Sequence, residues 1–368
     1  MKKLLFAAVS LDVGGIETAL VTLLNYLARE KKYDITLVLE RKEGIFLDTI
    51  DPAIKIIEYT PNADKNIITR KIKNLAKQIK FKAKYKNKYD FSASYATYSK
   101  PDSFVARTAS KNSALWVHGD YMTMFRKDKK EYINFFRELK SKKFKAIVFV
   151  SETAKNVFIK EIKTKQSVEV IHNLIDYENI IEKSKEQIED VKKSEIYTFL
   201  NVGRHTEEDK RLSRIIEASK LLKQDNLKFR IVMIGTGKDD KDYKKLVSKY
   251  SLQDQILFLG QKSNPYPYFK IADSLLTTSE HEGFPVVYIE AMTLGLPILT
   301  TEVSDSKKVI QNKYGIVTNK DVDSIYKAMK LAINQGIQNE ETFNCEEYNN
   351  QIKQKLNILI NNCGGKDE

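Results

Sequence analysis

The chain alternates short runs of apolar or β-branched residues with longer stretches in which apolar residues recur at helical spacing. This alternation is typical of parallel sheets covered by helices, and it occurs twice along the chain. The stretches Glu17 to Arg29, Ile67 to Lys82 and Ala154 to Ile162 are among the predicted helices. The runs that predict strands are KLLFAAV, DITLVLE, IKIIEY, FSASYA, ALWVH, AIVFVS and VEVIHN, then IYTFLNVG, FRIVMIG, ILFLG, SLLTTS, PILTT and GIVTN.

Two domains are expected, because 368 residues exceed what one hydrophobic core usually supports. The segment from Ile180 to Glu195 is charged, lacks aromatic residues and separates the two series of strands. We therefore predict doubly wound α/β domains over residues 1–185 and 186–345, and a C-terminal helix within 346–368 that packs back toward the first domain. Two such domains in tandem predict a central cleft that the carboxyl ends of their strands face.

The N-terminal stretch MKKLLFAAVSLDVGG resembles a signal peptide. Its apolar run is too short, however, and no small-residue cleavage site precedes Asp12, so we interpret it as the first buried strand. No other segment approaches the ~18 apolar residues that a membrane-spanning helix needs. The only cysteines, Cys345 and Cys363, give neither a disulfide framework nor a cysteine-based zinc site, which favours a reducing, cytoplasmic location.

The formal net charge is +13, and most of the excess lies in residues 1–190. Residues 65–88 contain ten basic residues and no acidic one, and a second basic stretch covers residues 126–145. Within the first stretch four apolar residues stand at helical spacing, Ile68, Ile72, Leu75 and Ile79. Solvated helix faces with apolar stripes on the core, contact with an anionic membrane surface or acceptor, and nucleic-acid binding are the alternatives. No nucleic-acid partner is expected, because no recognised binding motif accompanies the charge.

The stretch SEHEGFPVVYIEAM holds two carboxylates that the predicted structure separates. Glu282 follows a predicted strand, and Glu290 lies inside the helix for which Pro285 suits the first turn. Gly283 allows close approach of the backbone to a ligand. The free N–H groups of Val286 and Val287 would form an anion site at the helix N-terminus. A diphosphate there would leave Glu290 within reach of a ribose and Glu282 beside the group that the terminal phosphate carries.

Other candidate groups also follow predicted strands. Arg204 and Lys210 form a pair of cations suited to a diphosphate, although ion pairing and simple solvation would also explain them. Gly14 and Gly15 form a phosphate-approaching turn without the full dinucleotide-binding spacing. His118 places an imidazole at a strand end, where a structural hydrogen-bonding role is the alternative. Asp240 and Asp242 form an Asp-x-Asp pattern at a helix start, and we expect no metal site there because acidic residues stabilise that end of a helix anyway.

Eight ordered segments resemble the successive motifs of glycosyltransferase family 4, whose members are retaining enzymes with two facing Rossmann-like domains, the GT-B architecture. The resemblance extends from Lys2 to about residue 360 and is most specific from Ser279 to Thr300. The segments are GGIETALVTLL, WVHGD, FVSETAKNVF, VIHNLID, LNVGRHTEEDKRLSRIIEA, VMIGTG, ILFLGQ and SEHEGFPVVYIEAMTLGLPIL.

The resemblance implies a role for each matching position. Arg204 and Lys210 would bind the donor diphosphate, and Glu290 would bind the ribose hydroxyls. Glu282 would contact hydroxyls of the transferred sugar near the reacting carbon. Gly15 would approach the phosphates from the first domain, and His118 would lie by the sugar and acceptor. The backbone around sugar and phosphate would be that of Gly283, Phe284, Pro285, Val286 and Val287.

Three positions depart from the family pattern. Lys210 stands one residue further from Arg204 than is usual, so a one-residue loop insertion is needed to align it. Ser304 and Asp305 stand where many members have two glycines before an acidic residue. His281 stands where an aromatic residue is common.

The resemblance implies a metal-independent, retaining transfer of a sugar, without a cofactor. The donor would be a nucleotide sugar, with a UDP-sugar favoured over a GDP-sugar, and the acceptor a growing surface glycan or a lipid-linked molecule. The protein would be cytoplasmic or peripheral on the inner face of a bacterial cell membrane. A non-catalytic sugar-nucleotide-binding subunit of a glycosyltransferase complex and a sugar-nucleotide epimerase are the alternatives.

Overall fold

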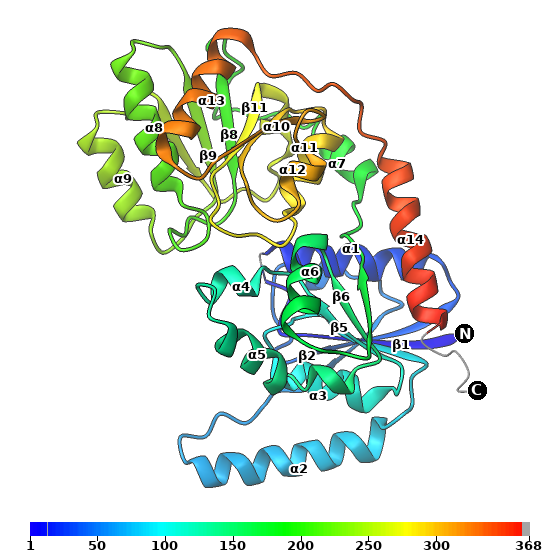
Figure 1. Ribbon diagram of the computed structural model, residues 1–368. Helices are drawn as coiled ribbons and strands as arrows, with labels where there is room; N and C mark the ends of the chain where they lie inside the picture. The colour runs from blue at the N-terminus through cyan, green and yellow to red at the C-terminus, as the bar shows by residue number, and fades with distance from the viewer. Residues whose placement is uncertain (13, 363–368) are drawn as a thin grey trace. The chain divides into compact units, whose positions relative to one another are not determined.

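The computed structural model describes residues 1–12 and 14–362, and it contains two compact units (Figure 1). The first unit comprises Met1–Leu174 together with the C-terminal helix from Tyr348, and the second comprises Ile175–Glu347. Each unit is built on its own parallel sheet, as the repeated alternation of strands and helices predicts.

The first unit contains a seven-stranded sheet in the order β3-β2-β1-β4-β5-β6-β7, with all strands parallel. Leu4 of β1 lies opposite Ile35 on one side and Phe91 on the other, in the buried centre of the sheet. The strands are β1 (Lys2–Ala8), β2 (Tyr33–Leu39), β3 (Lys55–Glu58), β4 (Phe91–Ser94), β5 (Ser113–Val117), β6 (Ala146–Phe149) and β7 (Ser167–Val170). The helices are α1 (Gly15–Arg29), η1 (Leu47–Thr49), α2 (Ile67–Tyr85), α3 (Lys100–Ala109), α4 (Tyr121–Met124), α5 (Lys129–Glu138), η2 (Ser141–Lys143) and α6 (Glu152–Glu161).

The second unit contains a six-stranded parallel sheet in the order β10-β9-β8-β11-β12-β13. Leu275 of β11 pairs with Leu200 of β8 and with Ile298 of β12. The strands are β8 (Thr198–Val202), β9 (Arg230–Ile234), β10 (Ile256–Gly260), β11 (Ser274–Thr277), β12 (Ile298–Thr301) and β13 (Gly315–Thr318). The helices are α7 (Tyr177–Lys183), α8 (Leu212–Gln224), α9 (Asp240–Lys249), α10 (Tyr266–Ile271), α11 (Val286–Thr293), α12 (Ser306–Val309) and α13 (Val322–Gln335).

The thirteen apolar runs of the sequence correspond to strands β1 to β13, which confirms the predicted doubly wound architecture. The run at the N-terminus is β1, in which Leu4 and Leu5 are fully buried. Strands in the middle of a parallel sheet are covered on both faces, so their sequences are apolar almost throughout and easily recognised.

The boundary between the domains differs from the prediction. The division falls between Leu174 and Ile175, about ten residues before the predicted end at residue 185, and the segment from Ile180 to Glu195 is not a free connection. Ile180 and Val191 in this segment are buried. The Tyr268 hydroxyl also donates a hydrogen bond of 2.8 Å to the Asp190 carboxylate. The segment therefore packs on the second unit although most of its residues are polar or charged, and two of its apolar side chains are buried.

The last helix, α14 (Cys345–Asn362), packs on the first unit from Tyr348 onward. The Tyr348 hydroxyl donates to the backbone carbonyl of Asn173 at 3.0 Å, and Lys355 Nζ donates to that of Val170 at 3.0 Å. Cys345 carries a free thiol, and Cys363 lies outside the described residues. Among the helices that the structure describes, none is both long and apolar enough to cross a lipid bilayer.

Each sheet reverses its strand order once, between β1 and β4 in the first unit and between β8 and β11 in the second. Loops that leave the carboxyl ends of two such strands diverge to opposite sides and leave a crevice, where ligands bind in open α/β sheets. The predicted Gly14-Gly15 turn follows β1. Arg204 and Lys210 follow β8, and Glu282 follows β11, so the topology brings the last three to one reversal point.

Candidate active site

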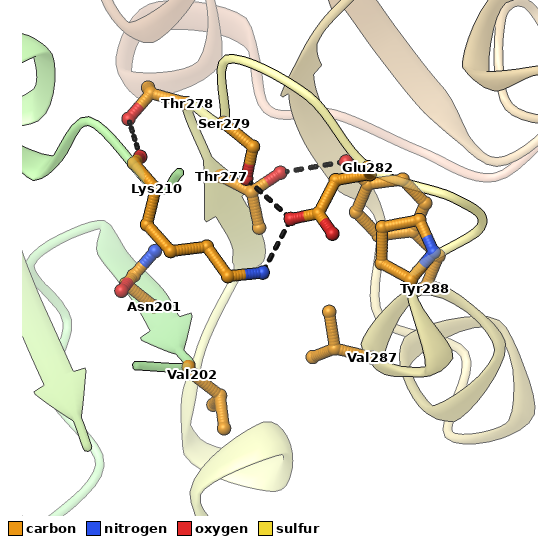
Figure 2. Close-up of a pocket in the computed structure, with 11 residues that line it drawn as sticks. Asn201, Val202, Lys210, Thr277, Thr278, Ser279, Glu282, Val287 and Tyr288 are labelled. Atoms are coloured by element: carbon orange, nitrogen blue, oxygen red, sulfur yellow. Dashed lines mark hydrogen bonds and ion pairs between the residues drawn. The ribbon is translucent and has the colours of Figure 1, made fainter. Parts of the chain in front are cut away.

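A pocket lies at the reversal point between β8 and β11, within the second unit (Figure 2). Its wall is formed by the ends of both strands, by the turn before α8 and by the beginning of α11. The side chain of Asn201 ties the two strands together, because its Nδ2 donates to the backbone carbonyl of Leu276 at 2.7 Å. The lining residues are Asn201, Val202, Gly203, Lys210, Thr277, Thr278, Ser279, Glu282, Pro285, Val287 and Tyr288.

Lys210 and Glu282 form an ion pair inside this pocket (Figure 2). The Lys210 side chain is 23% exposed and that of Glu282 is 16% exposed, so the pair is sheltered but open to a ligand. The Ser279 hydroxyl donates to the same carboxylate oxygen at 2.8 Å. An incoming phosphate would compete with Glu282 for the ammonium group, and the released carboxylate would be available to the hydroxyl groups of a ligand.

A compact turn brings Lys210 to the pocket in spite of its one-residue displacement. The backbone N–H of Lys210 donates to the carbonyl of Thr206 at 2.8 Å, which closes the turn ahead of α8. Arg211 then adopts a left-handed conformation, with φ of 51°, at the N-terminal boundary of the helix. The Thr278 hydroxyl donates to the Arg211 carbonyl at 2.9 Å and joins the turn to the end of β11. This turn therefore carries Lys210 to the pocket.

The N-terminus of α11 forms another side of the pocket. Pro285 occupies the N-cap position, so the helix begins one residue later than the predicted start, at Val286, and no side chain caps its first N–H groups. Tyr288 in the first turn is buried, and its hydroxyl lies 3.0 Å from Thr277 Oγ1 and 2.5 Å from Thr300 Oγ1. This hydrogen-bonded cluster fixes the helix end against two strand ends, so that the uncapped N–H groups and the helix dipole are available to an anion.

Glu280 is a structural anchor that sequence reasoning did not single out. Its carboxylate accepts a hydrogen bond of 2.5 Å from Arg214 Nη2, and Lys320 Nζ lies 3.4 Å away. Its backbone N–H donates to the Asp209 carbonyl at 2.7 Å. These contacts hold the loop after β11 against the start of α8. They place Glu282, two residues further along, beside Lys210.

The other candidates in this region do not line the pocket in the free protein. Arg204 is exposed, and its guanidinium makes no hydrogen bond or ion pair with another described residue. His281 Nε2 lies 3.4 Å from an Asp209 carboxylate oxygen. Phe284 is buried and packs edge-on against Tyr288 at a centroid distance of 6.2 Å. Gly283 is buried as well.

Glu290 lies further along α11, where its carboxylate accepts a hydrogen bond of 3.2 Å from the Tyr266 hydroxyl. Burial raises the pKa of Glu290 to about 7, and the hydrogen bond from Tyr266 opposes part of this shift. The Tyr266 pKa is raised in turn, by burial and by the neighbouring carboxylate. Near neutral pH the free protein is thus a mixture of protonated and ionised Glu290. Tyr266 is a second residue that sequence reasoning did not find, because its only signal is spatial.

The raised pKa of Glu290 predicts a pH dependence of nucleotide binding. Ribose hydroxyls donate to a carboxylate, so binding favours the ionised form, and affinity for UDP is expected to fall about tenfold between roughly pH 8 and pH 6. Calorimetric titration of UDP over this range measures the effect. The glutamine in Glu290→Gln cannot ionise, so this variant should lose that part of the pH dependence of UDP affinity. Only the part that comes from titration of the phosphate should remain. Identical pH profiles for the two proteins would contradict the assignment.

The same shift makes a prediction about stability. The folded-state pKa of Glu290 lies above its unfolded value. The contribution of this group to the free energy of unfolding is therefore fully present below the unfolded pKa and is lost as the pH rises through about 7. Glu290→Gln should therefore be more stable relative to the wild type at pH 8 than at about pH 5. Urea denaturation at the two pH values measures the difference.

Neither the turn after β9, which contains Gly235 and Gly237, nor the Asp-x-Asp pattern belongs to the pocket. A Cβ on Gly235 would lie 1.8 Å from the Gly203 carbonyl oxygen, so this turn packs directly on the loop after β8. Asp240 accepts from the buried His205 Nδ1 at 2.5 Å and from the Gly237 backbone N–H at 3.2 Å. Asp240 therefore has a structural explanation, which is to hold these two loops together.

The first unit contributes three predicted residues, which are described within that unit alone. His118 follows β5 and is buried, and its ring lies 4.5 Å from that of Tyr95 between centroids. Burial lowers the pKa of His118 to about 3, so the imidazole is neutral at physiological pH, and its Nε2 makes no hydrogen bond with another described residue. Gly14 is the N-cap of α1, and it has no side chain that could cap the first N–H groups of the helix. A Cβ on Gly15 would meet no heavy atom, so the helix end is open there.

The loop that departs from the family's double glycine carries backbone strain. Ser304 has φ of 47°, a conformation that favours glycine, and its buried hydroxyl has no hydrogen-bond partner among the described residues. Ser304→Gly is therefore expected to raise the free energy of unfolding by about 1 kcal/mol, as measured by urea denaturation. Ser306 is the control, because its hydroxyl accepts from the Val303 N–H at 3.0 Å. Ser306→Ala should be destabilising, and a destabilised Ser304→Gly would show that the strain is absent.

Two family models match the chain. The model described as Glycosyltransferase Family 4 matches residues 13–179, and the model described as Glycosyl transferases group 1 matches residues 182–354. Together they span both units and almost the whole chain.

Curated relatives belong to the same enzyme class. The chain is 24% identical over 347 residues to the UDP-Gal:alpha-D-GlcNAc-diphosphoundecaprenol alpha-1,3-galactosyltransferase of Escherichia coli, covering 89% of this chain and 87% of that protein. It is 24% identical over 191 residues to an uncharacterised glycosyltransferase of Methanocaldococcus jannaschii, covering 47% of each chain. It is 27% identical over 205 residues to the capsular polysaccharide biosynthesis glycosyltransferase CapH of Staphylococcus aureus, covering 52% of this chain and 55% of CapH. The match thus spans only about half the length of the latter two relatives.

Solved structures share the fold at low sequence identity. HepE of Anabaena, in complex with UDP and glucose, superposes with a TM-score of 0.76 at 16% identity, covering 97% of this chain and all of that one. The sucrose-phosphate synthase of Thermosynechococcus elongatus gives a TM-score of 0.75 at 15% identity, covering 98% and 99% of the two chains. With both family models matched in order and two parallel-sheet units of this topology, the chain belongs to the family 4 glycosyltransferases and has their GT-B fold.

Proposed function

We propose that this glycosyltransferase moves a sugar from a nucleotide-sugar donor, favouring a UDP-sugar, to a growing cell-surface glycan or a lipid-linked acceptor, with retention of configuration at the anomeric carbon. The observation that carries the donor assignment is the pocket at the reversal point between β8 and β11, where Lys210 and the uncapped end of α11 meet. Both features stabilise a diphosphate.

The chemistry follows from the charge that develops in the reaction. Cleavage of the bond between the anomeric carbon and the phosphate oxygen produces an oxocarbenium-like sugar and a nucleoside diphosphate. Lys210, the nearby exposed Arg204 and the α11 N-terminus would stabilise the extra negative charge on this leaving group. These groups supply positive charge from the protein itself, so we propose that transfer does not need a divalent metal ion.

The two carboxylates would hold different parts of the donor. Glu282 would leave its ion pair with Lys210 and accept hydrogen bonds from hydroxyl groups of the transferred sugar. Glu290 would accept hydrogen bonds from the ribose. Neither is assigned as a nucleophile. We propose front-face transfer, in which the acceptor hydroxyl attacks the anomeric carbon on the side of the departing phosphate and that phosphate takes its proton. The neutral, buried His118 is proposed to hydrogen-bond to the sugar or acceptor.

The acceptor class rests on the relatives. The Escherichia coli relative is named for a diphosphoundecaprenol-linked acceptor, and CapH for capsular polysaccharide biosynthesis. We propose the same broad class for this chain, which would act at the inner face of the cell membrane.

A panel of UDP-sugars and GDP-mannose, incubated with the protein in EDTA, tests the donor assignment. Release of the nucleoside diphosphate from one UDP-sugar, at a rate unaffected by EDTA, is the expected result. Interconversion of UDP-sugars without release of UDP would favour an epimerase, and absence of turnover with every donor would favour a non-catalytic subunit.

A further inference from the structure

Helix α2 exposes an apolar stripe instead of burying it. Packing of this stripe on the core, one of the alternatives that the sequence left open, is excluded for these side chains. They stand at positions i, i+4, i+7 and i+11 of the helix, so they share one face. Each is between 57% and 70% exposed, and they are Ile68, Ile72, Leu75 and Ile79.

A different face of α2 attaches the helix to the first unit. Phe81 is buried, with its ring 5.1 Å from that of Tyr59 and 6.0 Å from that of Phe104. The Asn74 side chain accepts a hydrogen bond of 2.7 Å from the Asn62 backbone N–H. In Figure 1, α2 is the outermost helix of this unit, beyond α3. The attachment uses Asn74 and Phe81, so the apolar stripe is not needed to hold the helix in place.

The helix that carries the stripe is strongly basic. Lys73 pairs with Asp64 at 2.8 Å, and Lys77 Nζ donates to the Thr60 carbonyl at 2.7 Å. The side chains of Arg70, Lys71 and Lys80 are exposed and make no ion pair or hydrogen bond with another residue that the structure describes. Residues 65–88 contain no acidic residue at all. An apolar stripe with cations beside it is the pattern of helices that lie in the interface of an anionic bilayer.

The second basic stretch lacks this pattern. Its aromatic residues Tyr132 and Phe136 are buried in the core of the unit, and Asp128, Glu131 and Glu138 interrupt its charge. An exposed apolar stripe on a basic helix is therefore found in α2 and not in residues 126–145.

We propose that α2 docks the first unit onto an anionic lipid surface, lying parallel to it, with the four apolar side chains inserted at the boundary between headgroups and acyl chains. A second copy of the chain is a poorer partner, because two such helices would bring their cations together. Nucleic acid would use the cations but leave the apolar stripe in water. The docking would keep the enzyme at the membrane where a lipid-linked acceptor resides. It does not depend on the sugar-transfer proposal, because α2 lies outside the pocket.

Co-sedimentation with vesicles tests the docking. The wild-type protein is expected to bind vesicles of phosphatidylcholine and phosphatidylglycerol at about three to one, to bind pure phosphatidylcholine much less, and to be partly released by about 0.5 M salt. Ile72→Asn with Leu75→Asn should weaken partitioning at least about tenfold. The matched control is Ile159→Asn with Ile358→Asn, which removes two exposed isoleucines from other helices and should bind as the wild type does.

A folding check and an insertion probe complete the experiment. The melting temperature and the affinity for UDP should be the same in the stripe variant and the wild type, because the stripe is exposed and the pocket is built by the other unit. In Leu75→Trp, tryptophan emission should shift to the blue on addition of anionic vesicles, whereas the native Trp116 is buried and should not respond. Wild-type binding retained in the stripe variant, an unshifted emission, or binding to RNA but not to vesicles would each overturn the proposal.

Discussion

Replacing Lys210 by alanine is expected to lower the rate of sugar transfer by about 10²–10³-fold, measured as release of nucleoside diphosphate in the presence of acceptor. The variant loses the one ammonium group among the residues that line the pocket. It also leaves the carboxylate of Glu282 without its ionic partner, so the pocket would repel a diphosphate instead of attracting it.

Two further variants test whether the loss of rate in Lys210→Ala comes from the missing positive charge at this position. Lys210→Arg keeps the positive charge and should recover part of the rate. Lys249→Gln on α9 is the control, because it removes an exposed ammonium group that does not line the pocket. It should transfer sugar at close to the wild-type rate. Wild-type turnover in Lys210→Ala would mean that the diphosphate lies elsewhere.

Replacing Glu282 by alanine is expected to lower transfer by about a hundredfold while UDP binds at least as tightly as it does to the wild type. The carboxylate is proposed to grip the transferred sugar, which UDP lacks. Its removal also frees Lys210, which Glu282 holds in the unliganded protein. Turnover assays and calorimetric titration with UDP measure the two effects separately.

The neighbouring Glu280 provides the control for this loop. Glu280→Ala removes the partner of Arg214 and is expected to lower the free energy of unfolding by about 1 kcal/mol. Any loss of transfer in that variant should come with weaker UDP binding, since the whole loop is loosened. If Glu282→Ala also lost UDP affinity and transfer in equal measure, Glu282 would orient Lys210 and not hold the sugar.

The strands in the middle of each sheet could be predicted from the sequence because both of their faces are covered and their residues are mostly apolar. The domain boundary could not, because Ile180 and Val191 are buried within a segment whose composition is that of a linker. Apolar content averaged over a charged segment does not reveal which few side chains point inward.

The site was only partly predictable for a related reason. Strand ends and a helix start indicated Lys210, Glu282 and the N-terminus of α11, since these signals are local. Glu280 and Arg214 lie 66 positions apart in the sequence, and Glu290 and Tyr266 lie 24 positions apart. No local sequence pattern indicates these contacts. Periodicity likewise found the stripe of α2, but the burial that decides its role depends on tertiary packing.

Calorimetric titration of UDP into the wild type and Lys210→Ala tests the central claim, that the pocket between β8 and β11 holds the diphosphate of the donor. We expect UDP to bind the wild type and to bind Lys210→Ala at least about tenfold more weakly, with unchanged affinity in the control Lys249→Gln on α9. Equal affinity for UDP in wild type and Lys210→Ala, or binding of neither UDP nor GDP to the wild type, would contradict it.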